Sequence, residues 1–104
     1  MHRLCHSDEI VDGESRGFEI NDLAFFIVNH NGHFYAYQNS CPHLGIELNW
    51  QENQFLDYDG QLIQCATHGA LFLIHNGQCV AGPCLGQQLK PLQITVDNGD
   101  IYLI

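Results

Sequence analysis

The amino-acid sequence predicts an all-β fold, an antiparallel barrel or sandwich built from short strands. Aromatic and β-branched residues fall in short runs that glycine, asparagine and aspartate separate, as is typical of strands joined by tight turns. No window of eleven or more residues shows a convincing helical period. The chain of 104 residues is about one domain's worth, so we expect a single domain over residues 1–104.

The first predicted hairpin joins residues 23–28 to residues 33–38. Between them lies Asn31-Gly32, a dipeptide that favours a tight two-residue turn. Side chains of the second strand should alternate between two faces, with Phe34 and Ala36 on one face and Tyr35 and Tyr37 on the other.

Further strands follow towards the C-terminal end. A second hairpin is predicted from residues 55–57 and 62–64, and a third from residues 92–96 and 101–103. One more strand is expected over residues 71–75, where Asn76-Gly77 ends it. Two stretches, 39–53 and 64–70, lack clean alternation and hold many of the cysteine and histidine residues.

The charge balance is strongly acidic, which restricts the choice of partner. Three Lys and Arg stand against twelve Asp and Glu, a formal net charge of −9. Binding to nucleic acid is therefore disfavoured, and a basic protein partner is the better expectation. No apolar run approaches the roughly 20 residues of a membrane span, and the first residues carry no export signal, so we expect a cytoplasmic protein without membrane contact.

The five cysteines and seven histidines carry the chemical signal. An odd number of cysteines in a reducing compartment argues against a disulfide framework. Two short segments each offer one thiolate and one imidazole, Cys41-Pro-His43 and Cys65-Ala-Thr-His68. A binuclear iron–sulfur cluster with two thiolates on one iron and two imidazoles on the other can be held by two such segments. A single Zn²⁺ would use the same donors, although zinc motifs usually separate the cysteines from the histidines, and binding of no metal is the third alternative.

These segments resemble the cluster-binding loops of Rieske proteins. The resemblance covers Cys-Pro-His-Leu-Gly at 41–45, Cys-Ala-Thr-His-Gly-Ala at 65–70 and Gly82-Pro83, which is similar to the proline loop that covers the cluster in that family. It implies a Rieske-like fold with a small cluster-binding part over about 39–84, and one [2Fe-2S] cluster per chain. By resemblance, Cys41 and Cys65 hold the inner iron, while His43 and His68 hold the outer iron.

The sequence departs from the Rieske proteins of respiratory cytochrome complexes at four positions. The resemblance places Ile46 and Ala66 where those proteins carry a disulfide pair, and Ala70 and Phe72 where they carry a serine and a tyrosine that donate hydrogen bonds to the cluster sulfurs. Without those donors we expect a reduction potential at the low end of the Rieske range, on the order of −150 mV. The pattern is similar to soluble Rieske ferredoxins of aromatic-ring dioxygenase systems, with a longer spacer at residues 48–53.

The resemblance implies a one-electron carrier that passes electrons from a flavin-containing reductase to an oxygenase or related acceptor. The chain is not expected to be an enzyme, because a Rieske fold leaves no residues for a catalytic iron domain. Two alternatives remain, an accessory subunit resembling the small subunit of nitrite reductase and a Rieske redox sensor. Cys5, Cys79 and Cys84 are expected to be small buried hydrophobic residues, and by resemblance Cys84 lies near the cluster.

Overall fold

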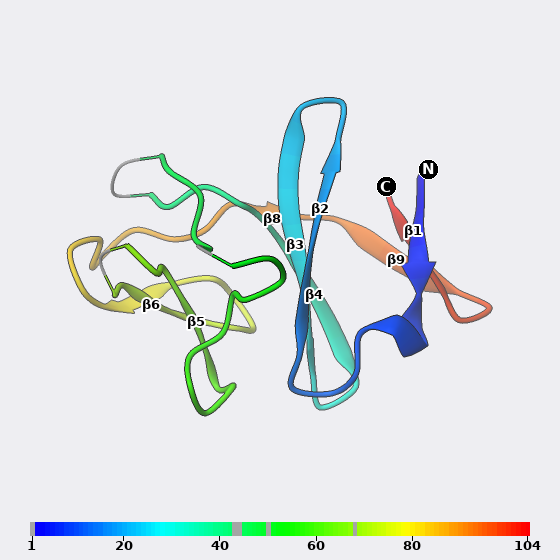
Figure 1. Ribbon diagram of the computed structural model, residues 1–104, viewed down its shortest axis with the longest axis horizontal. Coiled ribbons are helices and arrows are strands. Elements are labelled where there is room, and N and C mark those ends of the chain that lie inside the picture. The colour runs from blue at the N-terminus through cyan, green and yellow to red at the C-terminus, as the bar shows by residue number, and fades with distance from the viewer. Residues whose placement is uncertain (1, 43–44, 50, 68) are drawn as a thin grey trace.

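The computed structural model describes residues 2–42, 45–49, 51–67 and 69–104, and in that part the chain forms three antiparallel sheets (Figure 1). A sheet in the order β1-β10-β9 comprises His2–His6, Asp100–Leu103 and Ile94–Asp97. The central sheet, β2-β3-β4-β8, comprises Ser15–Ile20, Leu23–His30, His33–Gln38 and Pro91–Leu92. The third sheet, β5-β6-β7, comprises Leu62–Gln64, Leu71–Leu73 and Cys79–Ala81, and one 3-10 turn, η1, covers Ser7–Glu9. The predicted all-β class is confirmed.

Strand β3 is hydrophobic on both faces because the central sheet is covered on both sides. Phe25 and Ile27 pack in one core with residues of the β1-β10-β9 sheet. Phe26 and Val28 pack in a second core with residues of the β5-β6-β7 sheet and its loops. All four side chains are fully buried, which accounts for an unbroken apolar run where a half-exposed strand would alternate.

The β3-β4 hairpin has the predicted turn and the predicted alternation. His30 pairs with His33 across the turn, and Asn31 and Gly32 have φ angles of 56° and 83°, which a tight hairpin turn requires. The side chains of β4 divide between the two cores as expected, Phe34 and Ala36 with one and Tyr35 and Tyr37 with the other.

The other predicted strands differ from the structure in extent. The last hairpin forms as β9 and β10, but the predicted strand over 92–96 is divided, because Leu92 belongs to β8 and pairs with Ala36 in the central sheet. The predicted strand over 55–57 contributes a single bridge, Leu56 with Ile63. The predicted strand over 71–75 ends at Leu73 as β6. Strands β1, β2 and β7 were not predicted.

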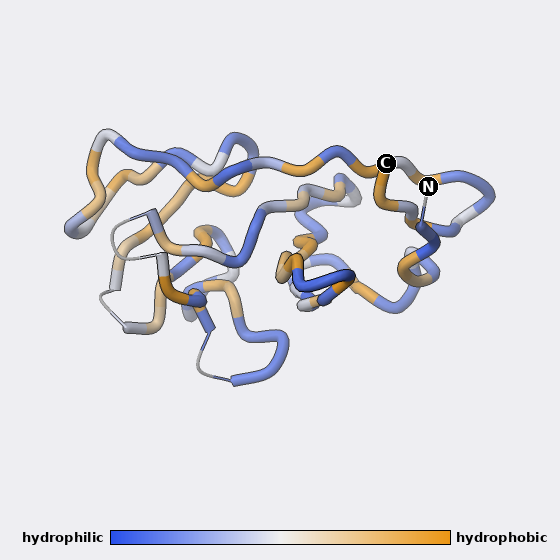
Figure 2. The backbone as a smooth tube through the Cα atoms, turned by 90° about the horizontal axis from the view of Figure 1, so that it is seen from above, coloured by the Kyte–Doolittle hydropathy of each residue, from blue (hydrophilic) through white to orange (hydrophobic). Residues whose placement is uncertain are grey.

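The two ends of the chain lie beside each other, because β1 pairs with β10. Seen from above, hydrophobic and hydrophilic stretches alternate along the tube, as expected for strands that bury part of their surface (Figure 2). No helix in the described part of the chain is long and apolar enough to cross a membrane.

A joint of hydrogen bonds and stacked rings connects the central sheet to the segment that precedes β5. The side-chain oxygen of Asn53 accepts a hydrogen bond from the Gly17 amide at 2.8 Å, and the Asn53 carbonyl accepts one from Ser15 Oγ at 2.9 Å. Phe55 stacks on Phe26 of β3, with ring centroids 4.4 Å apart. The joint fixes the third sheet and its loops on the central sheet.

Candidate metal centre

The two cysteine segments are closed by the same pair of backbone hydrogen bonds. In the first, the Cys41 amide donates to the Ile46 carbonyl at 2.7 Å, and the Gly45 amide donates to the Cys41 carbonyl at 2.6 Å. In the second, the Cys65 amide donates to the Ala70 carbonyl at 2.9 Å, and the Gly69 amide donates to the Cys65 carbonyl at 2.8 Å. In both segments the closing bonds hold the amide and the carbonyl of the cysteine, so each cysteine occupies the first position of a hydrogen-bonded loop.

Both cysteines are inaccessible to solvent and belong to the same buried core. The second segment is also bonded to the chain just beyond the first, because the Ala66 amide donates to the Leu48 carbonyl at 2.7 Å. Gly45 and Gly69, four residues beyond each cysteine, are exposed. Each segment thus runs from a buried thiol towards the surface, an arrangement that suits two inner sulfur donors.

The predicted donor set is only partly within the described residues. Cys41 and Cys65 lie in matching positions, as described above, whereas His43 and His68 lie outside the residues that the structure describes. The buried thiols fit an iron–sulfur cluster, because thiolates are the ligands that such clusters use and a dry site protects them. The assignment of all four ligands stays a prediction.

A third loop, which follows β7, packs against the second cysteine segment. A side chain at Gly82 would meet Ala70 at once, since a Cβ there would lie 2.7 Å from Ala70 Cα. Cys84, further along the same loop, belongs to the buried core that holds Cys41 and Cys65. The sequence placed the Gly82-Pro83 loop near the cluster by resemblance, and its described contacts agree with that expectation.

Residues 70 and 72, where the Rieske proteins of respiratory complexes carry hydroxyl donors, offer no side-chain hydrogen bond in this chain. Ala70 and Phe72 are fully buried in the core that holds the two cysteines, and neither carries a polar side-chain atom.

The expectation that Cys5, Cys79 and Cys84 are buried is confirmed, with 2%, 2% and 1% of their surface exposed. The role of Asn53 in the joint was missed, since no local pattern pairs it with β2.

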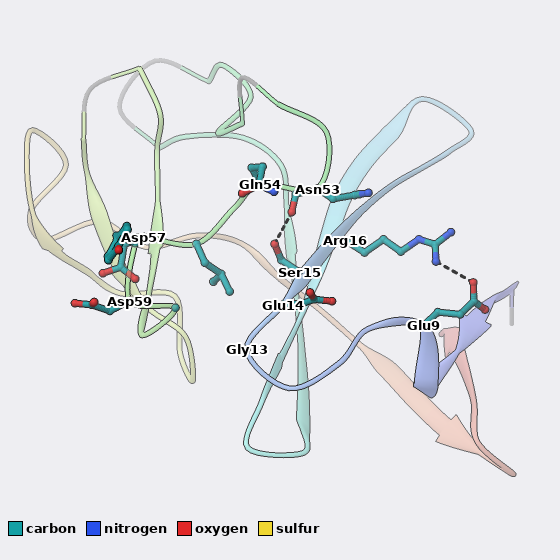
Figure 3. Close-up of a pocket in the computed structure, with 12 residues that line it drawn as sticks. Glu9, Gly13, Glu14, Ser15, Arg16, Asn53, Gln54, Asp57 and Asp59 are labelled. Atoms are coloured by element: carbon teal, nitrogen blue, oxygen red, sulfur yellow. Dashed lines mark hydrogen bonds and ion pairs between the residues drawn. The ribbon is translucent and has the colours of Figure 1, made fainter.

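An acidic groove of about 510 Å³ lies beside the joint (Figure 3). Asp57 and Asp59 lie on one side of it and Glu9 on the other, where Arg16 forms an ion pair with Glu9 at 2.9 Å. Arg16 and Glu9 are both substantially exposed, so this pair contributes little to stability. The groove adds to the negative surface that the net charge of −9 predicts.

Comparison with known protein families shows to which family the chain belongs. Residues 1–96 match the pattern of the protein family described as Rieske [2Fe-2S] domain. The chain belongs to the Rieske family. Its cofactor is accordingly one [2Fe-2S] cluster.

Individual relatives of this Rieske chain include proteins of two kinds. It is 34% identical over 93 residues to the ferredoxin component of an alkene monooxygenase system from Xanthobacter autotrophicus, which covers 88% of this chain and 71% of that protein. It is 27% identical to the iron–sulfur subunit of a cytochrome b6-f complex from Chlorobaculum tepidum, covering 93% of this chain but only 49% of that protein. Among solved structures, the Sphingomonas yanoikuyae B1 ferredoxin superposes with a TM-score of 0.76 and 27% identity, covering 97% of this chain and 94% of that one.

The Rieske fold predicted from the resemblance is therefore confirmed, as is the cofactor. The similarity to proteins named as ferredoxins extends over nearly the whole chain. The chain is an electron-transfer protein of the ferredoxin type and not a catalytic subunit.

Proposed function

We propose that this Rieske chain carries single electrons from a flavin-containing reductase to an oxygenase in the cytoplasm. The observation that carries the proposal is the matched closure of the segments at Cys41 and Cys65 around two buried thiols. The similarity to a ferredoxin component of a monooxygenase system supports an oxygenase as the acceptor. The net charge of −9 supports partners with basic surfaces, which an acidic carrier would approach faster.

In this proposal residues 1–104 form one domain, with a cluster-binding part over about 39–84. Cys41 and Cys65 hold the inner iron, and His43 and His68 hold the outer iron. When bound, the cluster supplies one-electron chemistry, because two ferric ions, two sulfides and two thiolates sum to zero charge and can accept one more electron.

The residues of the chain perform the remaining tasks. The core around Cys41 and Cys65 keeps water from the sulfurs, and the exposed ends of the two segments bring the site close to the surface where a partner can dock. Interfaces between electron-transfer proteins are small and short-lived, often burying less than about 1,200 Å², so the exposed ends of the two segments offer enough surface for a partner to dock.

Spectroscopy of the purified holoprotein tests the cluster assignment. We expect about two irons and two acid-labile sulfides per chain, and an electron paramagnetic resonance spectrum of the reduced protein with the low average g value of Rieske centres. Bound zinc without sulfide would contradict the assignment.

Turnover tests the carrier role. With a flavin-containing ferredoxin reductase and the oxygenase component of an alkene monooxygenase system, the chain should be reduced and then reoxidised by one electron per cycle. The reduction rate should fall as salt rises, because screening weakens the attraction between an acidic carrier and a basic reductase. A carrier that the reductase reduces but the oxygenase never reoxidises would refute this choice of acceptor.

A further inference from the structure

Two histidines oppose each other at the end of the β3-β4 hairpin. His30 is the last residue of β3, His33 is the first residue of β4, and the two are directly paired across the turn. Directly opposed residues of antiparallel strands have their side chains on the same face of the sheet, with Cβ atoms about 4.5–5.5 Å apart. Each member of this histidine pair can therefore bring a ring nitrogen to one common point beside the sheet.

The turn that joins the histidine pair is fixed by hydrogen bonds from both of its amides. The Asn31 amide donates to the Asp12 carboxylate at 2.7 Å, and the Gly32 amide donates to the side-chain oxygen of Asn29 at 3.1 Å. The Asn29 side chain is buried and donates in turn to the Ile10 carbonyl at 2.8 Å. These bonds hold the two strand ends in place, so a ligand bound between them pays little to order the backbone.

The histidine pair is accessible, and its surroundings are negative. His33 is exposed and His30 is half-buried. Strand β8 pairs with β4 at Ala36 and Tyr37, so in the described part of the chain no strand lies along the edge of β4 beside His33. The Asp12 carboxylate at the turn and the net charge of −9 favour a cation here.

The histidine pair is separate from the candidate metal centre. It lies where β3 turns into β4, at the end of β4 that is remote from the first cysteine segment (Figure 1). Gln38 ends β4 just before that segment, and about 17 Å of extended strand separates it from His33. Neither His30 nor His33 belongs to the donor set proposed for the cluster.

We propose that His30 and His33 together bind one divalent transition-metal ion of the class that includes Zn²⁺, Ni²⁺ and Cu²⁺, with water in its remaining positions. Imidazole is a preferred ligand of these ions, whereas Mg²⁺ and Ca²⁺ prefer oxygen donors. Structural zinc sites use four protein ligands, so a site with two is exchangeable. The bound ion links β3 to β4 across the turn. This site goes beyond electron transfer, since it needs neither the cluster nor a redox partner.

Titration calorimetry with Zn²⁺ tests the site on the iron-loaded holoprotein, prepared without a histidine tag. We expect one Zn²⁺ per chain. His30→Gln and His33→Gln should each weaken Zn²⁺ binding by at least about tenfold, because the second imidazole of a pair binds within the same molecule at a high effective concentration. Both variants should keep the iron content and the visible spectrum of the unmodified protein.

His75→Gln and His2→Gln are matched controls. Each removes one exposed histidine that is not opposed to another histidine, since His2 pairs with Leu103 and His75 lies beyond the end of β6. Their Zn²⁺ affinity should stay within about twofold of the original. Thermal unfolding gives a second readout, because Zn²⁺ at a hundred times its Kd shifts the unfolding equilibrium by about 100-fold towards the folded state. That shift should be present in both controls and lost in both variants of the histidine pair.

Loss of Zn²⁺ binding in both variants of the histidine pair, with binding kept in both controls, supports the proposal. Equal Zn²⁺ affinity in all of these proteins would overturn it, as would a loss confined to a control or the absence of binding to the unmodified protein. If His30→Gln distorts the hairpin, His33→Gln decides the question, because His33 is exposed and lies outside both hydrophobic cores.

Discussion

Replacing Gly82 with alanine tests whether the third loop keeps the second cysteine segment closed. Gly82 has a φ of +97°, and an added Cβ would lie 2.7 Å from Ala70 Cα and 3.3 Å from Ala70 N. These are backbone atoms, which cannot rotate out of the way. The Ala70 carbonyl also accepts the hydrogen bond from the Cys65 amide that closes the segment. We expect Gly82→Ala to displace Ala70 and to weaken that closure.

Gly86 in the same loop provides a matched control. Its φ is +90°, and an added Cβ would meet nothing within 4 Å. Both substitutions place alanine in a left-handed conformation at a cost of about 1–3 kcal/mol, partly offset by about 0.4–1 kcal/mol from the less flexible unfolded chain. Only Gly82→Ala adds overpacking, which costs about 1–3 kcal/mol. The free energy of unfolding should fall by about 1 kcal/mol for Gly86→Ala and by about 2–4 kcal/mol for Gly82→Ala.

Thermal unfolding of the two holoproteins at one scan rate measures the difference. A domain of this size loses about 4–8 °C of Tm per kcal/mol, so Gly82→Ala should melt at least about 5 °C below Gly86→Ala. Because cluster loss makes unfolding irreversible, the decay of visible absorption at a fixed temperature is the second measurement, and it should be faster in Gly82→Ala. Equal melting temperatures and equal decay rates would refute the role given to the Gly82 contact.

Three further outcomes follow from the structure. Cys65→Ala should abolish iron binding, whereas Cys5→Ala, which removes a buried thiol from the other core, should keep the full iron and sulfide content. A redox titration should give a midpoint potential on the order of −150 mV, and a clearly positive value would show that unrecognised donors act on the cluster. Hydrogen bonds from the His6 amide and from Arg16 hold the pKa of Glu9 below its ordinary value of 4.5. Ionised Glu9 therefore stabilises the fold above pH 4.5, and this stabilisation is lost as the pH falls through the pKa of Glu9 in the folded protein. The unmodified protein should have a higher urea midpoint than Glu9→Gln at neutral pH, and the difference should vanish in acid.

The features that could be predicted from the sequence are those that depend on neighbouring residues. Asn31-Gly32 has its turn conformation because of local backbone preference, and the alternation along β4 follows from the geometry of a strand. The segments at Cys41 and Cys65 were recognisable because thiolate and imidazole donors recur at short spacing. The roles of His43 and His68 stay predictions.

The features that could not be predicted depend on partners far along the chain. Strand β2 mixes serine, arginine and glutamate with apolar residues, and it becomes a strand because β3 pairs with it. The sequence pattern groups Leu92 with the strand that follows it, but Leu92 pairs with Ala36 of β4 and so lies in the central sheet. The bond from Gly17 to Asn53 joins residues 36 positions apart, a contact with no local signal.

The matched hydrogen bonds at Cys41 and Cys65 bear on the speed of electron exchange. An electron crosses between proteins slowly when the atoms around the donor must move before and after the transfer. Here each cysteine that we propose as a ligand has its amide and its carbonyl held by bonds within its own segment, so little motion should accompany a change of oxidation state. Two copies of this chain should therefore exchange electrons rapidly on each productive collision, even though their like charges make such collisions rare.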